Sequence, residues 1–526
     1  MRRLDSCAVL ALLTLAALAA LAGCATSSLD MAPERPDRPW QPRTDASGAI
    51  QPGAPVLAST YLETYQESGR ESNREPRRGT YRLPANPALA AVSPPPPLEP
   101  DHAYTLAELI DIAETSNPTT RIAWNDARNA ALVAGVAKSA YLPQLSLAAM
   151  GQYAAAHGSS SSVLGDSSAS ASTHGLTSVV ALQWLLFDFG GRAARVEAAS
   201  QASVIANIGF TAVHQQVVYD TSVAFYTYQA VRARVVTAEQ GLENAGAVAD
   251  AAKSRYRRGI GTVIEVAQAN QNYAQAKLAL VQAKGAQSNA YLALISAMGI
   301  SPLSKPKIAD MPVRALSPAL RQPVEQIVAS AIARRPDVLS AYAAQRANLA
   351  KIQAAESEFK PKVFLSASGV YNTSSSSLSA VPAIGQQLPT VNLSGGRYGG
   401  SVIVGVSIPL YDGGLRSAAL AQARNDADSA STRLERSREE AVRQIVGAQN
   451  LLQTSLTAHE AAKELLTAAQ TTYDAAFDAY RHGVGSVTDA LLAQNQLLVA
   501  KNAYADSYSN ALSAAASLAL ATGAID

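Results

Sequence analysis

Apolar positions recur at helical spacing from residue 105 onward. Thr105 and Glu108 form a capping box around the start of the apolar series Leu106, Leu109, Ile110 and Ala113. Asn117 precedes Pro118, and proline suits the first position of a helix because that position needs no N–H donor. The pattern therefore predicts one helix that begins after Thr105 and a second that begins at Pro118 and ends near Tyr141.

Two pairs of much longer helices are predicted further along the chain. Residues 192–257 and 416–481 contain no proline and little glycine, and after a glycine turn the chain returns over residues 263–298 and 487–522. At about 1.5 Å per residue, each outgoing helix would extend roughly 100 Å. In the second pair, small and apolar residues recur at three- and four-residue steps, which predicts a closely packed coiled-coil seam of Ala423, Ala427, Ala430, Leu434, Ala441, Ile445, Ala448 and Leu452.

Between the short and the long helices, apolar and polar residues alternate with a period of two. This alternation predicts four β-strands, around residues 145–153, 180–186, 363–371 and 402–410. Residues 158–175 are almost entirely Ser, Ala and Gly, so we expect them to form a connecting loop, with a longer loop at residues 374–398.

Alternating segments of about ten residues suit strands that cross a bilayer, although strands of a β-sandwich have the same pattern. Four strands do not close a barrel around a channel, and open sheet edges are not tolerated in lipid. If these strands span a membrane, several chains must therefore share one barrel.

The chain carries one series of landmarks twice. The matched segments are, in order, Asn117-Pro118 and Arg335-Pro336, then Phe187-Asp188-Phe189-Gly190-Gly191 and Leu410-Tyr411-Asp412-Gly413-Gly414, then Tyr256-Arg257-Arg258-Gly259-Ile260-Gly261 and Tyr480-Arg481-His482-Gly483-Val484-Gly485, and finally Met298-Gly299 and Thr522-Gly523. Landmarks repeated in one order indicate an internal duplication. We place the first repeat at residues 101–315 and the second at residues 316–526.

The amino terminus has the features of a signal peptide over residues 1–23. Arg2 and Arg3 precede an apolar run that ends in Leu21-Ala22-Gly23-Cys24. This ending resembles a bacterial lipobox, so we expect cleavage before Cys24 and lipid attachment to it. Cleavage would also remove Cys7, which is the other of the two cysteines, so the mature chain would have no partner for a disulfide. Ala25 after the cysteine, rather than Asp, favours sorting to the outer membrane.

A proline-rich segment separates this anchor from the helical part of the chain. Residues 24–100 hold more than half of the 26 prolines. Such a composition does not bury enough apolar surface to fold by itself, so we predict an extended tether, free or laid along the folded body.

Composition and charge argue against several classes of function. The formal net charge of +2 gives no reason to expect a nucleic acid partner. Beyond the signal peptide we find no apolar run long enough for a transmembrane helix. The six histidines are scattered without metal-ligand spacing, and neither a glycine-rich phosphate loop nor a nucleophile elbow is recognisable. We therefore expect no metal, no cofactor and no enzymatic activity.

Together these motifs resemble the TolC-type outer-membrane channel family. The resemblance spans residues 105–523 and rests on the Asn-Pro helix start, on Leu142-Pro143-Gln144-Leu145, on the two strand ends with Asp and Gly-Gly and on the two Tyr-Arg-x-Gly-x-Gly turns. It implies a mainly α fold with a small β part. Three chains of four strands each would share a transmembrane β-barrel in outer-membrane lipid, and their helices would form a long coiled-coil α-helical barrel in the periplasm.

The resemblance also implies a function. Members of the family are export channels that perform no chemistry themselves. They close like an iris at the periplasmic tip, where they meet a periplasmic adaptor protein connected to an inner-membrane pump.

The resemblance further assigns residues to the tip. Its turns would be formed by Gly259, Gly261, Gly483 and Gly485. Glu265 and Asp489 begin the returning helices, where the helix dipole alone favours an acid. In a trimer, three copies of Asp489 would also form an acidic ring that selects cations. Well-known members carry a second acid one turn later, where this chain has Leu492.

A closed-state lock is implied at the same place. Tyr480 and Glu265 match a tyrosine and an acid that link the inner hairpin to the outer one in well-known members. The arginine that completes the link in those members is replaced by Gly485. We therefore expect a lock with fewer bonds and a resting tip that closes less firmly.

The alternative to a channel is a lipid-anchored periplasmic coiled-coil adaptor or a structural lipoprotein. An adaptor needs one hairpin and compact flanking β domains, whereas this chain has two equivalent hairpins, which favours the channel. The cargo stays open. A lipobox is commoner in members that serve drug-efflux pumps of the resistance-nodulation-division type, but residues 104–113 and 121–124 resemble members assigned to type I secretion with an ABC exporter, including the cyclolysin-export protein.

Overall fold

The computed structural model describes Leu83 and residues 85–89, 98–99, 101–163, 165–311, 323–381 and 389–525. The chain divides into two compact units, residues 1–95 and 96–526. In the first unit the one described element is the 3₁₀ helix η2 (Pro87–Leu89). The predicted signal peptide, Cys24, most of the tether and the predicted boundary between the repeats all lie outside the described residues.

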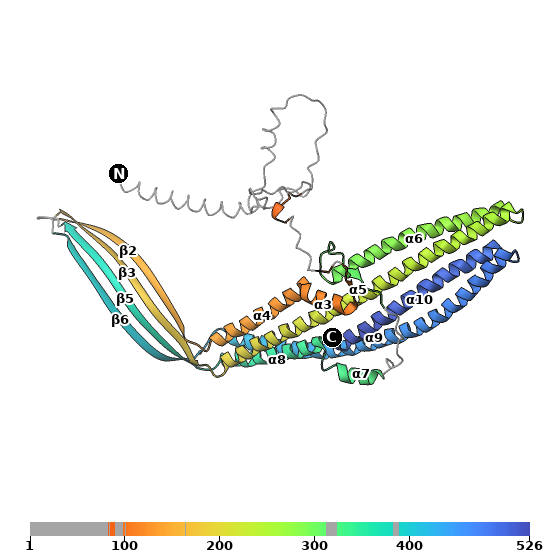
Figure 1. The fold of residues 1–526 in the computed structure, drawn as a ribbon. Helices are drawn as coiled ribbons and strands as arrows, with labels where there is room; N and C mark the ends of the chain where they lie inside the picture. Colours follow the sequence, from red (N-terminus) through yellow and green to blue (C-terminus); the bar gives the residue numbers. More distant parts are fainter. Residues whose placement is uncertain are drawn as a thin grey trace, which may run out of the picture. The chain divides into compact units, whose positions relative to one another are not determined.

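The second unit contains two successions of helices and strands (Figure 1). The first consists of α3 (Leu106–Ser116), α4 (Pro118–Ser139), β2 (Gln144–Ser162), β3 (Gly165–Phe187), α5 (Gly191–Arg257) and α6 (Val263–Ala297). The second consists of α7 (Val324–Ala331), α8 (Pro336–Ser357), β5 (Lys362–Val381), β6 (Val391–Ser407), α9 (Leu415–His482) and α10 (Val487–Ala521). A short parallel pair, β1 (Ala103–Tyr104) with β4 (Lys307–Ile308), joins the two ends of the first succession.

The predicted starts of the short helices are confirmed. The capping box between Thr105 and Glu108 is complete in both directions. The Asn117 side chain accepts a hydrogen bond from the Thr119 amide at 2.9 Å, and Pro118 occupies the first helical position. The first turn of α4 thus has a side-chain acceptor for an otherwise unpaired donor, which is why the helix starts at this residue.

The long hairpins are confirmed to within one residue at each end. α5 and α9 contain 67 and 68 residues, and α6 and α10 contain 35 residues each. All eight residues of the predicted seam in α9 are buried. The first part of the seam packs against α8, where Leu434 and Ala441 meet Val338, and the last part packs against α10, where Leu452 meets Ala511 and Ala514. α10 packs against α5 of the other hairpin as well. Within the described residues, no helix combines the length and the hydrophobicity that crossing a membrane requires.

The strands form one antiparallel sheet in the order β2-β3-β5-β6, so the two repeats meet at the β3–β5 pair. The prediction that residues 158–175 form a loop was wrong, because β2 and β3 stay paired as far as Ser162 and Gly165. Most of residues 374–398 are likewise strand. Backbone pairing needs no apolar side chains, and cross-strand hydroxyl pairs add to it, as between Ser172 and Ser377 at 2.7 Å.

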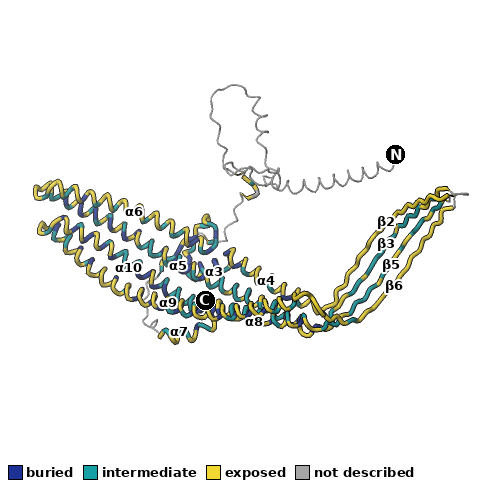
Figure 2. The backbone as a smooth tube through the Cα atoms, turned by 180° about the vertical axis from the view of Figure 1, so that it is seen from behind, coloured by how far each residue is buried: buried dark blue, intermediate teal, exposed yellow. Residues whose placement is uncertain are grey.

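The two faces of the sheet differ in polarity. Residues paired across strands share a face. One face carries apolar and aromatic residues in paired rows: Leu147 with Val180, Tyr371 with Tyr398, and Tyr153 with His174. The other face carries Gln144 with Gln183, Ser368 with Ser401, and Asn372 with Arg397. Figure 2 shows that the outer strands β2 and β6 are exposed along their length, whereas β3 and β5 are partly covered.

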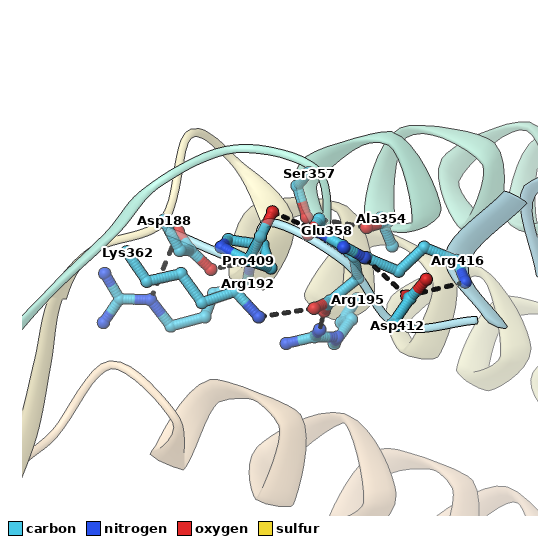
Figure 3. A network of polar contacts seen from close by, with 10 residues as sticks. All are labelled: Asp188, Arg192, Arg195, Ala354, Ser357, Glu358, Lys362, Pro409, Asp412 and Arg416. Atoms are coloured by element: carbon cyan, nitrogen blue, oxygen red, sulfur yellow. Dashed lines mark hydrogen bonds and ion pairs between the residues drawn. The ribbon is translucent and has the colours of Figure 1, made fainter. Parts of the chain in front are cut away.

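An aspartate–arginine pair fixes each passage from strand to long helix (Figure 3). Asp188 accepts a hydrogen bond from the Arg192 amide at 2.6 Å, and its carboxylate lies 3.5 Å from Arg192 Nε. The Arg192 guanidinium also donates to the Leu186 carbonyl at 3.0 Å and the Ala140 carbonyl at 3.3 Å. One buried side chain thus holds together the ends of α4 and β3 and the start of α5.

The second repeat builds the same junction in a more exposed form. Arg416 Nε donates to Asp412 at 2.6 Å, and its Nη1 donates to the Pro409 carbonyl at 3.0 Å. These bonds hold the pKa of the Asp412 carboxyl below its usual value. Between the junctions, Glu358 pairs with both Arg195 and Lys362. This network keeps both helix starts in register with the sheet.

The first junction should contribute more to stability than the second. The Asp188 and Arg192 side chains are each 7% exposed, whereas Asp412 is 27% exposed. Arg192→Gln would leave a buried carboxylate without its cation, at a cost of about 3–5 kcal/mol. We expect it to lower the melting temperature of the purified protein, followed by circular dichroism, well below that of the matched variant Arg416→Gln. Equal melting temperatures would contradict this ranking.

Candidate functional site

The candidate site lies where the two hairpins turn. Because α5 and α9 run unbroken from the sheet to these turns, the turns lie at the ends of the helices remote from the sheet. Gly259 and Gly483 have φ of 72° and 85°, a backbone conformation that side chains with a Cβ rarely adopt. The second glycine of each pair instead allows the turn to pack closely against the end of the preceding helix. A Cβ on Gly485 would lie 3.1 Å from the Ala479 Cβ.

Glu265 and Asp489 occupy equivalent places in the first turn of the returning helices. The Glu265 amide donates to Thr262 Oγ1 at 3.2 Å, and the Asp489 amide donates to Ser486 Oγ at 3.1 Å. Ser486 Oγ in turn donates to the Asp489 carboxylate at 2.7 Å. Both acids thus lie close to the positive end of a helix dipole.

Tyr480 connects the two hairpins. It belongs to the last turn of α9, its side chain is fully buried, and its hydroxyl donates to Glu265 Oε2 of α6 at 3.4 Å. Burial, and secondarily the negative charge of Glu265, raises the pKa of the Tyr480 phenol. The phenol therefore stays protonated, and able to donate, throughout the neutral range.

The sequence analysis missed Arg255, which lies against both of these residues. Its guanidinium donates to the Tyr480 carbonyl at 3.3 Å, and its Nε lies 3.9 Å from Glu265 Oε2. A signal for it was present, because the matching residue of the second repeat is Ala479, so the two turns differ at this position. The structure thus brings Tyr480, Glu265 and Arg255 together.

The remaining predicted gate residues are exposed. Asp489 is exposed, and Leu492, one turn further along α10, has 57% of its surface accessible. An exposed leucine beside an exposed acid suits a surface that another chain covers or that lines a passage.

Apolar packing supports the polar link between the hairpins. One buried cluster contains residues from all four long helices: Val248, Ala249, Ala252, Ala269, Tyr480, Val487 and Ala490. Further from the tip, the fully buried Gln494 of α10 accepts a hydrogen bond from Asn272 of α6 and donates one to the Gly241 carbonyl of α5, both at 3.1 Å. The two hairpins of one chain are therefore joined over several helical turns.

Comparison with known proteins decides the family. The sequence profile of outer membrane efflux proteins matches residues 109–300 and 327–524, which are most of the chain. The chain belongs to the outer membrane efflux protein family. It is 28% identical over 407 residues to Protein CyaE of Bordetella pertussis, across 77% of this chain and 81% of that protein.

Two further proteins are similar over comparable lengths. Outer membrane protein TolC of Escherichia coli is 25% identical over 413 residues, across 78% of this chain and 80% of TolC. The crystal structure of the outer membrane protein VceC of Vibrio cholerae shares the fold, with a TM-score of 0.66 and 20% identity, across 80% of this chain and 96% of VceC.

Membership of this family establishes the class of function and the location. The protein is an outer-membrane efflux or secretion channel with a periplasmic helical extension, and not an enzyme. Members of the family work with adaptor and pump partners in tripartite systems. Among the described residues, no three His, Cys, Asp or Glu side chains are grouped as a metal site would require.

The glycine at position 485 generates a prediction. We expect Gly485→Arg to add a cation to the lock where well-known members carry arginine, and to lower the conductance of the resting channel in a planar bilayer. Gly485→Ala is the control, because it introduces the same close contact with Ala479 without the charge. A conductance of Gly485→Arg equal to that of the natural channel would refute the expectation that the natural tip closes less firmly.

Proposed function

We propose that three copies of this chain assemble into one export duct, with a shared twelve-stranded barrel in the outer membrane and a helical tunnel in the periplasm. The observation that carries the proposal is the four-stranded sheet, which has one apolar face and two exposed edge strands. The duct would receive cargo from an inner-membrane pump through a periplasmic adaptor that docks on the tip.

The edge strands require partners. β2 and β6 pair on one side only, and their residues are exposed almost throughout. In lipid an unpaired backbone N–H or C=O costs several kcal/mol, so an open sheet edge does not persist there. Pairing β6 of one copy with β2 of the next satisfies both edges, and three copies close the ring.

The apolar face has the dimensions of a membrane band. On β3 it runs from Trp184 to His174, which pairs with Tyr153. The ten steps between these two residues, at about 3.3 Å each and tilted by about 40°, span roughly 25 Å of bilayer thickness. Aromatic residues lie at both ends of this stretch, Trp184 at one and Tyr153 at the other, and the paired Tyr371 and Tyr398 lie between them, in register with Ser178 of β3. The serine-rich strand ends beyond Tyr153 would then project from the outer surface.

The helices also present faces that neighbouring copies would cover. α6 has only three buried residues, whereas α10 has eleven. Large apolar side chains of α6 are exposed, among them Ile264, Leu278, Val281 and Leu292. A row of exposed apolar residues along one helix marks an interaction surface. In a trimer the tunnel wall would bury it.

Conductance of the purified mature protein in a planar lipid bilayer tests the proposal. We expect discrete, long-lived channels, together with a trimeric mass in detergent. Well-folded protein that gives no channels would refute the shared barrel and favour the alternative, an anchored periplasmic coiled-coil lipoprotein.

The selectivity of that channel tests the role of Asp489. In the trimer three copies of this exposed acid would meet at the tip and favour cations. We expect Asp489→Asn to move the reversal potential in a salt gradient toward that of a non-selective pore. Asp478→Asn is the control, because Asp478 is an exposed acid that lies by Arg481 and His482. An equal reversal potential in both variants would contradict a role of Asp489 in cation selectivity.

Two classes of cargo have separate support. The similarity to Protein CyaE over most of both chains supports secretion of a protein, and the predicted lipobox at Cys24 supports drug efflux. Deleting the gene separates them. Loss of a secreted protein with unchanged drug sensitivity supports the first class, and greater drug sensitivity with unchanged secretion supports the second.

A further inference from the structure

We propose that Arg255 is a positioning residue of the gate. It holds the two hairpins of one chain together and supplies the cation that well-known family members carry at the position of Gly485. The inference rests on the proposed channel, since it concerns how firmly the tip of that channel closes. It is carried by the contacts of one guanidinium group with three different segments of the tip.

Arg255 donates hydrogen bonds at the carboxyl ends of both α5 and α9. It lies in the last turn of α5, where its Nη2 donates to the Ile260 carbonyl of the following turn at 3.4 Å. Its Nη1 donates to the Tyr480 carbonyl in the last turn of α9 at 3.3 Å. The Tyr480 carbonyl also accepts from the Gly483 amide at 3.1 Å, and the dipole at a helix carboxyl end favours a cation. One arginine therefore stabilises both helix ends and connects them.

The same guanidinium lies between an aromatic ring and a carboxylate. Its central carbon is 5.1 Å from the centre of the Tyr480 ring, and its Nε is 3.9 Å from Glu265 Oε2. The Arg255 side chain is only 12% exposed, so salt and water screen these charges weakly. Arg255 Nε is buried and has no hydrogen-bond partner among the described residues. The Glu265 carboxylate is the charged group placed to accept from it.

These contacts divide into two groups when the hairpins separate. The bonds to the Tyr480 carbonyl and ring cross from the first hairpin to the second, and so does the bond from the Tyr480 hydroxyl to Glu265. The contacts of Arg255 with Ile260 and Glu265 stay within the first hairpin. Outward movement of α9 would therefore break the polar contacts that join Tyr480 to the first hairpin but leave Arg255 and Glu265 together. Because Glu265 keeps Arg255 as its partner, opening the tip does not leave its carboxylate unpaired.

The repeat explains why the cation comes from this hairpin. Arg255 and Ala479 occupy matching places, and each packs against the second glycine of its own turn. The matching tyrosines differ as well, because Tyr480 is fully buried whereas Tyr256 is exposed. One turn supplies the buried tyrosine and the other supplies the arginine, so the duplicated ends have become complementary.

Single-channel recording with three variants tests the proposal. Arg255→Gln removes the cation but keeps a long polar side chain, Arg255→Lys keeps the charge, and Arg257→Gln removes an exposed charge from the same helical turn. We expect Arg255→Gln to raise the open fraction roughly tenfold, the factor that corresponds to about 1.4 kcal/mol. Arg255→Lys should restore part of the closure, and Arg257→Gln should behave like the natural protein.

A second substitution separates Arg255 from the tyrosine hydroxyl. Tyr480→Phe keeps the ring and the carbonyl that Arg255 contacts and removes only the bond to Glu265. Arg255→Gln should therefore raise the open fraction further in the Tyr480→Phe background. Trimer mass and melting temperature of each variant report whether the fold is kept.

The outcomes distinguish this inference from the proposed function. Absence of channels from the natural protein would refute the channel and this inference with it. Channels whose open fraction is the same in Arg255→Gln and Arg257→Gln would overturn the role of Arg255 alone. A rise that occurs only together with a loss of trimer mass would also overturn it, because that result indicates a fold defect.

Discussion

The backbone of a sheet in lipid must leave no N–H or C=O group unpaired, and the architecture of this protein depends on that requirement. One chain supplies four strands, with β3 and β5 of the two repeats paired at the centre and one free edge at each side. A single copy does not meet the requirement, which is why the proposed function is an assembly. The buried Asp188–Arg192 pair fixes α5 relative to β3, and the Asp412–Arg416 pair fixes α9 relative to β6, so the helices follow the arrangement of the sheet.

In the proposed channel, the tip at the far end of the helices must open and close reversibly. A gate needs contacts that close it and that break at modest cost. The described contacts are of that kind: long hydrogen bonds at 3.3 and 3.4 Å, a ring beneath a guanidinium and a cluster rich in alanine. Bonds of this length contribute less than those at the strand–helix junctions, several of which measure 2.6–3.0 Å. The firm contacts therefore lie by the sheet and the weaker ones at the tip.

Local patterns predicted the regular elements well and the sheet less well. Helix starts are decided by neighbours in sequence, so Thr105, Asn117 and the two glycine turns gave bounds that the structure confirms. The serine-rich residues 158–175 were predicted as a loop because they lack apolar alternation. Residues 168–174 are strand because ladder bonds and a hydroxyl pair with residues more than 200 positions away hold them in place, and residues 158–162 pair with them and their neighbours across the hairpin. Arg255 was missed for a related reason, since its partners Tyr480 and Glu265 acquire meaning only when the hairpins pack.

By itself the sequence determined the helical hairpins, their seam and turns, the positions of Tyr480 and Glu265 and the family resemblance. All of these depend on spacing along the chain. Only the tertiary structure decided how far the strands extend, which face of the sheet is apolar, and that a guanidinium of the first hairpin lies against the tyrosine of the second. These features depend on groups that are distant in sequence and adjacent in space, and a periodic pattern carries no information about such pairs.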